Sequence, residues 1–351
     1  MCRNYNFLLL WYNFCMKRIA FLIHPRDVHD LYRRFPFLKI LGDDFNEAVL
    51  KNLRFPKRIG FTICSKFDIY GQAEGYLIAV LLTAKQIMTD RENARKRILD
   101  ALLYAQNKLG VELIGLGALT KSVTEGGRWL ANNEKVRAKI TNGDALTTAV
   151  ALEAIDEIIK KKALRDPVIA IVGATGIIGQ ALSRLLISHK LILIGRNPER
   201  LKQSFPDLTE TSRVVLSGRL SDAIDADIII TATNHHDSFV KSEHLKRNAV
   251  VYDIAQPSNV LPDVIKERPD IVSLDGGHVS IPGINLKFNM GTPRGTTFAC
   301  LAETILHALE NDDKDYIGYV DAGSVKLIKE RAKKHNFVHA PFTSCGKQIN
   351  F

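Results

Sequence analysis

The sequence predicts an α/β protein of two domains, and three observations lead to this prediction. The chain has 351 residues, which exceeds the length of a typical single domain. Its 46% hydrophobic and 25% charged residues match an ordinary globular composition. After Pro167, short apolar runs alternate with stretches of helical periodicity, which is typical of a doubly wound parallel sheet. We therefore expect an α/β substrate domain followed by a parallel-sheet domain and C-terminal helices.

The expected boundaries follow from composition. The first domain is placed at residues 16–160, the second at 161–310 and a helical tail at 311–351. A helical run that Asp144 is expected to cap at its start ends in three lysines, which complement the helix dipole. The stretch Lys161–Pro167 is interpreted as the boundary between the two domains.

The first half predicts strands at residues 19–23, 37–41, 59–64 and 113–117. From Gly75 the apolar residues recur at intervals of three and four, which predicts an amphipathic helix that Gly110 ends as a C-cap. In the second half we expect strands at Val168–Val172, Leu191–Ile194, Ala226–Thr231, Ala249–Asp253 and Ile271–Leu274, and helices at Ile177–Ser188, Leu261–Glu267, Thr297–Leu309 and Ser324–Lys334.

Charge and cysteine content narrow the class of partner. The formal net charge is +10, but no nucleic-acid-binding motif accompanies it, so an acidic protein or a phosphorylated substrate is the better expectation. The five cysteines are scattered without a CxxC pair, which fits a reducing cytosol rather than a disulfide framework. No set of ligating residues has metal-site spacing, so we expect no bound metal.

The N-terminal residues 1–15 contain an apolar run that is too short to span a bilayer and lacks a cleavage site. We expect Met16 to be the functional start and no transmembrane segment in the chain. Peripheral contact with a membrane stays open, and the sequence predicts no particular oligomeric state.

The clearest motif is a glycine-rich loop that follows the strand at 168–172. A GxxGxxG loop between an apolar strand and an apolar helix is the phosphate-binding turn of a dinucleotide-binding Rossmann domain. The glycines allow a tight turn, close approach of the pyrophosphate and close helix packing. The predicted cofactor contacts here are Gly173, Ala174, Thr175, Gly176, Ile177, Ile178 and Gly179.

The next strand ends in Arg196 and Asn197, where an enzyme that uses NAD commonly has an acidic residue. An arginine there suits the 2′-phosphate of NADP, so NADPH is the predicted cofactor. Thr231, Ala232 and Thr233 end another strand, and their small side chains predict the place where the nicotinamide ribose approaches the sheet.

Cys300 is the candidate nucleophile. Thr296 or Thr297 is expected to cap the following helix, which places Cys300 in its first turn. A cysteine at a helix N-terminus has a lowered pKa and more thiolate. From the residues alone, core packing remains the stronger interpretation of a single cysteine on an apolar helix.

The chain resembles the long-chain acyl-[acyl-carrier-protein] reductases of the cyanobacterial type and their bacterial relatives. The resemblance covers most of the length and rests on the glycine strand at 113–117, the Thr141-Asn-Gly143 turn, the loop at 172–179, Asp275-Gly-Gly277 and the Phe298-Ala-Cys300 string. It implies that Cys300 carries the acyl group, that NADPH reduces it to a fatty aldehyde, and that the substrate is a thioester of acyl-carrier protein or coenzyme A.

The resemblance leaves several roles open. Asp144 stands where an asparagine is expected, and residues 234–237 and 278–295 diverge. Thr120, Thr141 and the backbone around Cys300 are candidate oxyanion donors. His278 could protonate an alkoxide, although a structural role is the preferred interpretation, as it is for His235 and His236.

Two other functions compete with acyl-thioester reduction. One is an NADP-dependent dehydrogenase of the amino-acid or shikimate type that acts on a small ketone or imine and does not need Cys300. The other is a non-catalytic protein that binds NADP.

Overall fold

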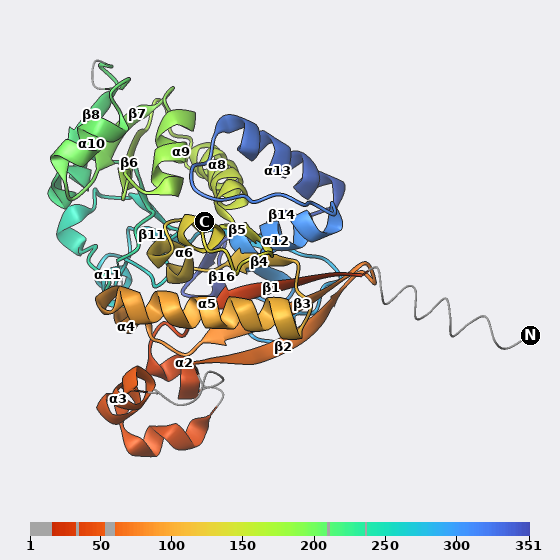
Figure 1. Cartoon of the computed structure of the whole chain (residues 1–351). Coiled ribbons are helices and arrows are strands. Elements are labelled where there is room, and N and C mark those ends of the chain that lie inside the picture. Colours follow the sequence, from red (N-terminus) through yellow and green to blue (C-terminus); the bar gives the residue numbers. More distant parts are fainter. Residues whose placement is uncertain (1–15, 33–34, 53–59, 209–210, 236) are drawn as a thin grey trace, which may run out of the picture.

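The computed structural model describes residues 16–32, 35–52, 60–208, 211–235 and 237–351. The expectation about residues 1–15 therefore lies outside the described residues, as does the one about His236. The described chain is a two-domain α/β structure in which each domain is built on its own sheet (Figure 1).

The first domain contains a five-stranded sheet with the order β2-β3-β1-β4-β5. Its strands are β1 (Lys17–Ile23), β2 (Phe61–Ile69), β3 (Ala73–Val80), β4 (Leu113–Leu116) and β5 (Lys139–Thr141). Only β2 runs antiparallel to its neighbour, whereas the other pairs are parallel.

The expected helix from Gly75 is wrong over its first part. Residues 75–80 belong to β3, which pairs with both β1 and β2 and is buried on both faces. A continuous apolar run fits such a strand as well as it fits a buried helix, so periodicity alone misassigned it. The helical pattern begins only after Thr83, which caps the next helix.

Helix α5 (Arg91–Lys108) packs on β1 and β3 of this sheet. The other helices of this half of the chain are α2 (Val28–Tyr32), α3 (Asp43–Asn52), α4 (Ala84–Thr89), α6 (Leu119–Val123), α7 (Arg128–Ala131) and α8 (Asp144–Lys161). The predicted strand at 37–41 is instead the 3-10 helix η1 (Pro36–Leu41), because Pro36 at its first position favours a helical turn. The predicted glycine stop at Gly110 is confirmed, with φ +68°.

The second domain has the predicted parallel sheet, with the order β11-β10-β9-β6-β7-β8. Its strands are β6 (Val168–Val172), β7 (Lys190–Ile194), β8 (Val214–Ser217), β9 (Ile228–Thr231), β10 (Val250–Asp253) and β11 (Val272–Asp275). The helical elements are α9 (Ile177–Leu185), α10 (Pro198–Ser204), η2 (Leu220–Asp225), η3 (Ser242–His244) and α11 (Pro262–Glu267). Strand β8 was not predicted, since its run of four residues is short and half exposed.

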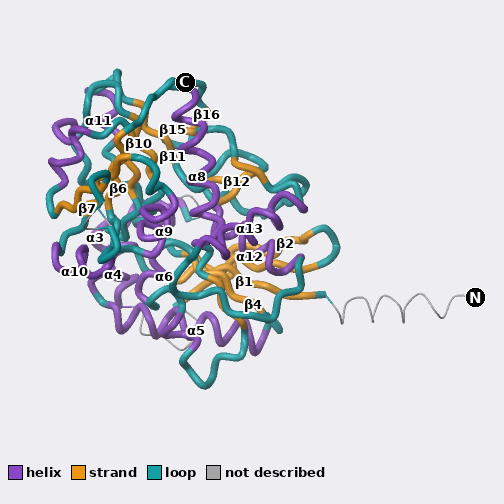
Figure 2. Tube along the Cα trace, turned by 90° about the horizontal axis from the view of Figure 1, so that it is seen from above, coloured by secondary structure: helices purple, strands orange, loops and turns teal. Residues whose placement is uncertain are grey.

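The last part of the chain joins the two domains. It contains β12 (His278–Ser280), β13 (Thr296–Phe298), α12 (Ala299–Leu309), α13 (Ala322–Lys334), β14 (Val338–His339), β15 (Thr343–Ser344) and β16 (Lys347–Gln348). The expected all-helical tail at 311–351 is therefore wrong beyond α13, where short strands follow (Figure 2).

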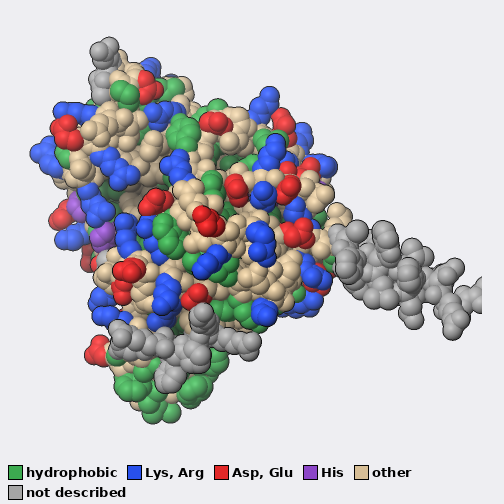
Figure 3. Space-filling view, viewed as in Figure 1, with side chains coloured by type: hydrophobic (Ala, Val, Ile, Leu, Met, Phe, Trp, Pro, Cys, Tyr) green, Lys and Arg blue, Asp and Glu red, His purple; other side chains and the backbone are tan. Residues whose placement is uncertain are grey.

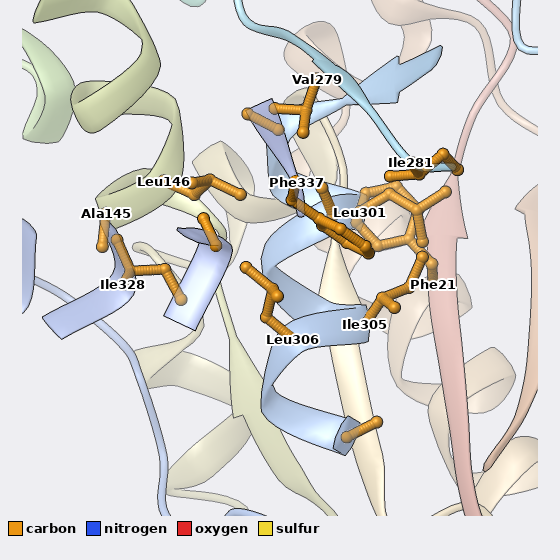
Figure 4. Packing of buried hydrophobic residues seen from close by; sticks show 14 of the residues in the cluster. Phe21, Ala145, Leu146, Val279, Ile281, Leu301, Ile305, Leu306, Ile328 and Phe337 are labelled. Atoms are coloured by element: carbon orange, nitrogen blue, oxygen red, sulfur yellow. The ribbon is translucent and has the colours of Figure 1, made fainter. Parts of the chain in front are cut away.

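Helix α12 packs on the sheet of the first domain rather than on the parallel sheet. Leu301, Ile305 and Leu306 are buried in one cluster with Phe21 of β1 and Ile328 of α13 (Figure 4). This packing fixes the start of α12, where Cys300 lies, relative to β1 and β4.

Candidate active site

A cleft of about 1320 Å³ is lined by segments that follow strands of both sheets. From the first domain come residues after β1, β4 and β5, and from the second domain residues after β6, β7, β9 and β10. Ligands of open parallel sheets bind at these carboxyl ends, so the topology places the cleft where a substrate and a cofactor can meet.

The glycine loop forms one wall of the cleft. Gly173 has φ +90°, and a Cβ there would lie 2.7 Å from the oxygen of Ala232. A Cβ on Gly179 would lie 2.3 Å from the oxygen of Gly173, so α9 can approach the loop only at a glycine. The backbone of Gly173 and Gly176, which carries no side chain, and the first turn of α9, whose N–H groups lack intrahelical acceptors, fit the pyrophosphate of a dinucleotide.

The predicted loop residues divide into two groups. Gly173, Thr175, Gly176, Ile177 and Ile178 line the cleft. Ala174 and Gly179 do not line it, and both are buried beneath the loop. The motif is thus partly a contact surface and partly the packing that holds this surface in place.

The residues after β7 divide in the same way. Arg196 lines the cleft, as predicted, and so does Arg200, which the sequence analysis did not single out. Asn197 does not line it, because its side chain caps α10 by accepting from the N–H of Arg200 at 3.0 Å. Two exposed guanidinium groups therefore stand at the place where a 2′-phosphate would lie.

At the end of β9, Ala232 and Thr233 line the cleft but Thr231 is fully buried. The Thr231 hydroxyl donates to the carboxylate of Asp253, which also accepts from Ser258 and from backbone N–H groups. Thr231 therefore holds two strand ends together rather than a cofactor.

The same cleft is lined by an ion pair between the partly exposed Lys121 of α6 and the buried Asp144 of α8. Burial lowers the pKa of Lys121, but the charge and hydrogen bond of Asp144, together with Cys300 and Glu303, outweigh this effect and raise the pKa above its ordinary value. Asp144 was predicted as a helix cap, but Gly143 occupies that position and frees the Asp144 side chain. Lys121 was missed because a single lysine after a short strand carries no local signal.

Cys300 lines the cleft beside this ion pair. Phe298, not a threonine, precedes its helix at the capping position. Burial raises the pKa of the Cys300 thiol to about 11, although Lys121 and the backbone N–H of Leu301 act in the opposite direction. The expected lowered pKa is therefore wrong, because the loss of solvent around the thiol outweighs the effects of Lys121 and of the helix N–H group.

Glu303, one turn after Cys300 in α12, is hydrogen-bonded to residues on either side of Asp144. Its fully buried carboxylate accepts from the backbone N–H of Leu146 at 2.7 Å and from the hydroxyl of Thr141 at 2.9 Å. Burial would raise the pKa of Glu303, but hydrogen bonds from His307, Leu146 and Thr141 lower it. The carboxylate thus fastens the turn that carries Asp144 onto the helix that carries Cys300.

Three candidate donors lie outside the reactive part of the cleft. Thr120 is buried and donates to the oxygen of Gly117, and Thr141 donates to Glu303, so neither hydroxyl points at a substrate. His278 is buried in β12 beside Phe298 and does not line the cleft, which agrees with its structural interpretation. His235 lines the cleft near Phe239.

Within the described ranges, no cluster of three or more His, Cys, Asp or Glu side chains has the arrangement of a metal site. No described helix is long and apolar enough to cross a membrane.

Comparisons with known proteins address the class of enzyme. Residues 153–275 match the family model described as shikimate / quinate 5-dehydrogenase. The chain is 30% identical over 293 residues to aminotransferase PigE of a Serratia strain, covering 79% of this chain and 34% of that protein. It is 27% identical over 285 residues to a long-chain acyl-[acyl-carrier-protein] reductase of Synechococcus elongatus, covering 75% and 80% of the two chains. The chain spans about a third of the length of the Serratia relative.

Among solved structures, shikimate 5-dehydrogenase from Thermus thermophilus, in complex with NADP(H) and shikimate, overlaps with a TM-score of 0.39 and 13% identity. That overlap covers 91% of this chain and 100% of the Thermus chain. The family match spans the glycine loop and the parallel sheet of the second domain, which agrees with the prediction of a dinucleotide-binding domain over these residues. The family match agrees better with the dehydrogenase alternative than with acyl-thioester reduction.

Proposed function

We propose that this chain reduces an acyl thioester to an aldehyde with NADPH, through a thioester on Cys300. The observation that carries the proposal is that Cys300, the Lys121–Asp144 pair and the glycine loop line one continuous cleft. The 27% identity to a curated acyl-carrier-protein reductase over 80% of that protein supports the same chemistry.

NADPH is proposed rather than NADH because Arg196 and Arg200 line the cleft just beyond β7. Guanidinium groups make charge-assisted hydrogen bonds to a phosphate, whereas a ribose hydroxyl would need an acceptor there. When bound, NADPH supplies the hydride that, together with one proton, converts the enzyme-bound thioester into an aldehyde and a free thiol.

Before hydride transfer, residues of this chain move the acyl group from the carrier to Cys300. Cys300 Sγ forms a bond to the thioester carbonyl carbon, and the carrier sulfur leaves with the proton that the Cys300 thiol gives up. Since the raised pKa keeps the thiol protonated at neutral pH, this proton must move during the attack. The Lys121–Asp144 pair is adjacent and can relay it, while the Lys121 ammonium stabilises the oxyanion.

The remainder of the cleft suits an apolar chain. Its first-domain wall includes the apolar side chains of Phe21, Ile23, Leu31, Leu81 and Met88. These side chains are a surface on which an acyl group can pack, because burying each methylene contributes about 0.8 kcal/mol.

The deciding experiment is intact-mass spectrometry of the enzyme mixed with an acyl-carrier-protein or acyl-coenzyme A thioester in the absence of NADPH. We expect an acyl adduct on Cys300 that disappears, with release of aldehyde, when NADPH is added. A Cys64→Ser variant is the control, because Cys64 lines the same cleft. An enzyme that oxidises NADPH with no adduct would contradict the proposal.

A second candidate is a dehydrogenase that acts on a small ketone or imine, and the family match over residues 153–275 favours it. In that reaction the Lys121–Asp144 pair would exchange the proton of the alcohol or amine, and Cys300 would be a lining residue only. Turnover of such a substrate by a Cys300→Ala variant at the wild-type rate would support this candidate.

A further inference from the structure

The cleft carries more positive charge than its acidic side chains can neutralise. Its acidic lining residues, Asp30, Glu125 and Asp144, all have a cation as partner. The lining cations that have no acidic partner among the described residues are Arg91, Arg128, Arg196, Arg200 and Lys287. On the face of the molecule seen in Figure 3, by contrast, Lys and Arg side chains are interspersed with acidic ones. The cleft is therefore suited to anionic ligands.

A bound dinucleotide accounts for only part of this charge. Arg196 and Arg200 follow β7, at the place of the 2′-phosphate, and the other three unpaired cations come from outside the second domain. Beside the glycine loop, the described part of the second domain therefore offers the pyrophosphate backbone N–H groups but no further lining cation. A cation that reaches the pyrophosphate from elsewhere has to belong to the opposite wall of the cleft.

Arg128 of that opposite wall rests on the bare backbone of Gly318. A Cβ on Gly318 would lie 2.5 Å from Nε and from Nη2 of Arg128, so any other residue there would displace the guanidinium. The N–H of Gly318 donates to the oxygen of Gly126 at 3.1 Å, which holds this backbone against the turn that carries Arg128. Glu125, an acid in the same turn, is paired with Arg95 at 2.5 Å. The Arg128 guanidinium thus has a defined position and, within the described chain, no acidic partner.

The turn that carries Arg128 lies against the start of α9. A Cβ on Gly126 would lie 2.8 Å from Cδ1 of Ile177, which is the first residue of that helix. Gly126, Arg128 and Ile177 all line the cleft, as does Gly176 of the glycine loop. The N–H groups at the start of α9 are those that a pyrophosphate would accept from. The guanidinium and these N–H groups therefore lie close to the same phosphate position.

A carrier thioester also bears a phosphate, but the position of Arg128 fits that phosphate less well. The oxygen of Gly318 accepts from Asn142 at 3.2 Å, and a Cβ on the next residue, Gly143, would lie 2.3 Å from Cα of Cys300. Arg128 is thus connected through a few successive contacts with the reacting end of the cleft. The phosphate of a carrier is a whole pantetheine arm away from the thioester, whereas the pyrophosphate of a dinucleotide is one ribose away from the nicotinamide. The dinucleotide is therefore the better ligand for this guanidinium.

We propose that Arg128 binds the pyrophosphate of the dinucleotide from the first-domain side, so that both domains hold the cofactor. Its guanidinium donates charge-assisted hydrogen bonds to the pyrophosphate oxygens, in addition to those from the N–H groups of the glycine loop and α9. Arg128 then recognises what NADPH and NADH share, while Arg196 recognises the 2′-phosphate that only NADPH has. The inference rests on the cofactor part of the proposed function and not on the acyl chemistry.

The test is calorimetric titration of the full chain, without substrate, with NADPH, NADH and adenosine 2′,5′-bisphosphate, which has the 2′-phosphate but no pyrophosphate. Arg128→Leu should raise the Kd for NADPH and the Kd for NADH about tenfold each, since both lose a charge-assisted hydrogen bond, and should leave the Kd for the bisphosphate unchanged. Arg196→Leu should show the complementary pattern, in which NADPH and the bisphosphate bind more weakly and NADH binds as before. Arg128→Lys, which keeps the charge without the planar fork, should lie between Arg128→Leu and the wild type.

The matched control is Arg91→Leu, which removes the other first-domain arginine of the cleft that has no acidic partner, and it should change none of the three Kd values. Unchanged binding of the bisphosphate by Arg128→Leu shows that this variant is folded. Unchanged binding of both dinucleotides by Arg128→Leu would overturn the proposal and assign the guanidinium to an anionic group of the substrate. Equal weakening of the bisphosphate would also overturn it, because the guanidinium would then lie at the adenosine end. A chain that shows the expected binding pattern but forms no aldehyde would support the proposal and contradict the acyl chemistry alone.

Discussion

The two walls of the cleft are built in different ways. The cofactor wall comes largely from one stretch of chain, in which β6, the glycine loop and α9 follow one another. The opposite wall brings Lys121, Asp144 and Cys300 together from three separate elements. The first wall can be recognised as a local pattern, whereas the second exists only because α12 packs on the sheet of the first domain.

The largest effect is expected from replacing Cys300, which lies in the wall opposite the cofactor wall. We expect Cys300→Ser to lower aldehyde formation by at least about a thousandfold, because a hydroxyl replaces the attacking sulfur. NADPH binding, measured by fluorescence titration, should not change, since the cofactor wall is separate. The Cys64→Ser variant is the control. Equal losses of aldehyde formation in the two variants would contradict a specific role for Cys300.

The next largest effect is expected at the ion pair. Lys121→Met should lower turnover about a hundredfold, because the oxyanion loses a nearby positive charge. Lys85→Met, which alters an exposed lysine outside the cleft, should have no effect.

Lys121→Met should also change the pH dependence of Cys300 alkylation, which a purely structural role of Lys121 would leave unchanged. In the wild type, alkylation of Cys300 should rise about tenfold per pH unit towards the thiol pKa of about 11, since only the thiolate reacts. Lys121 lowers this pKa, so Lys121→Met should move the profile to higher pH. A shift to lower pH would contradict the arrangement.

A further prediction concerns the close packing of Gly143 against Cys300. Gly143 has φ +71°, and a Cβ there would lie 2.3 Å from Cα and Cβ of Cys300. Gly143→Ala should lower the free energy of unfolding by about 3–4 kcal/mol, through left-handed strain and overpacking together. Gly71→Ala, at φ +66° with open space around it, should cost only about 1–2 kcal/mol. Urea denaturation compares the two, and similar losses would mean that the contact with Cys300 is not tight.

The smallest effect is expected on nucleotide binding, from replacing Arg196 in the cofactor wall. Arg196→Leu should raise the Kd for NADPH about tenfold and leave that for NADH unchanged, because only the 2′-phosphate loses a partner. Arg165→Leu, which alters an exposed arginine outside the cleft, should change neither value. Equal weakening for both nucleotides would place Arg196 away from the 2′ position.

The sequence predicted the cofactor domain more accurately than the substrate domain, for a physical reason. Parallel strands such as β6 and β9 are short apolar runs with clear turns, so their positions could be inferred within about two residues. Residues 75–80 form an equally apolar run, but pairing with β1 and β2 decided that it is a strand. The cofactor contacts were likewise predicted only in part, because Asn197 and Thr231 have the expected positions while their side chains serve the local packing.

Neighbouring residues in the chain are enough to specify a parallel-sheet domain with a dinucleotide loop, because that signal lies in short apolar runs and in the sterics of glycine. Three features instead required the folded molecule: the high pKa of the half-buried Cys300 thiol, the position of Lys121 and Asp144 beside it, and the outward direction of the apolar side chains in residues 35–49. Each of these depends on neighbours that distant segments supply, since desolvation and charge act through space and not along the chain.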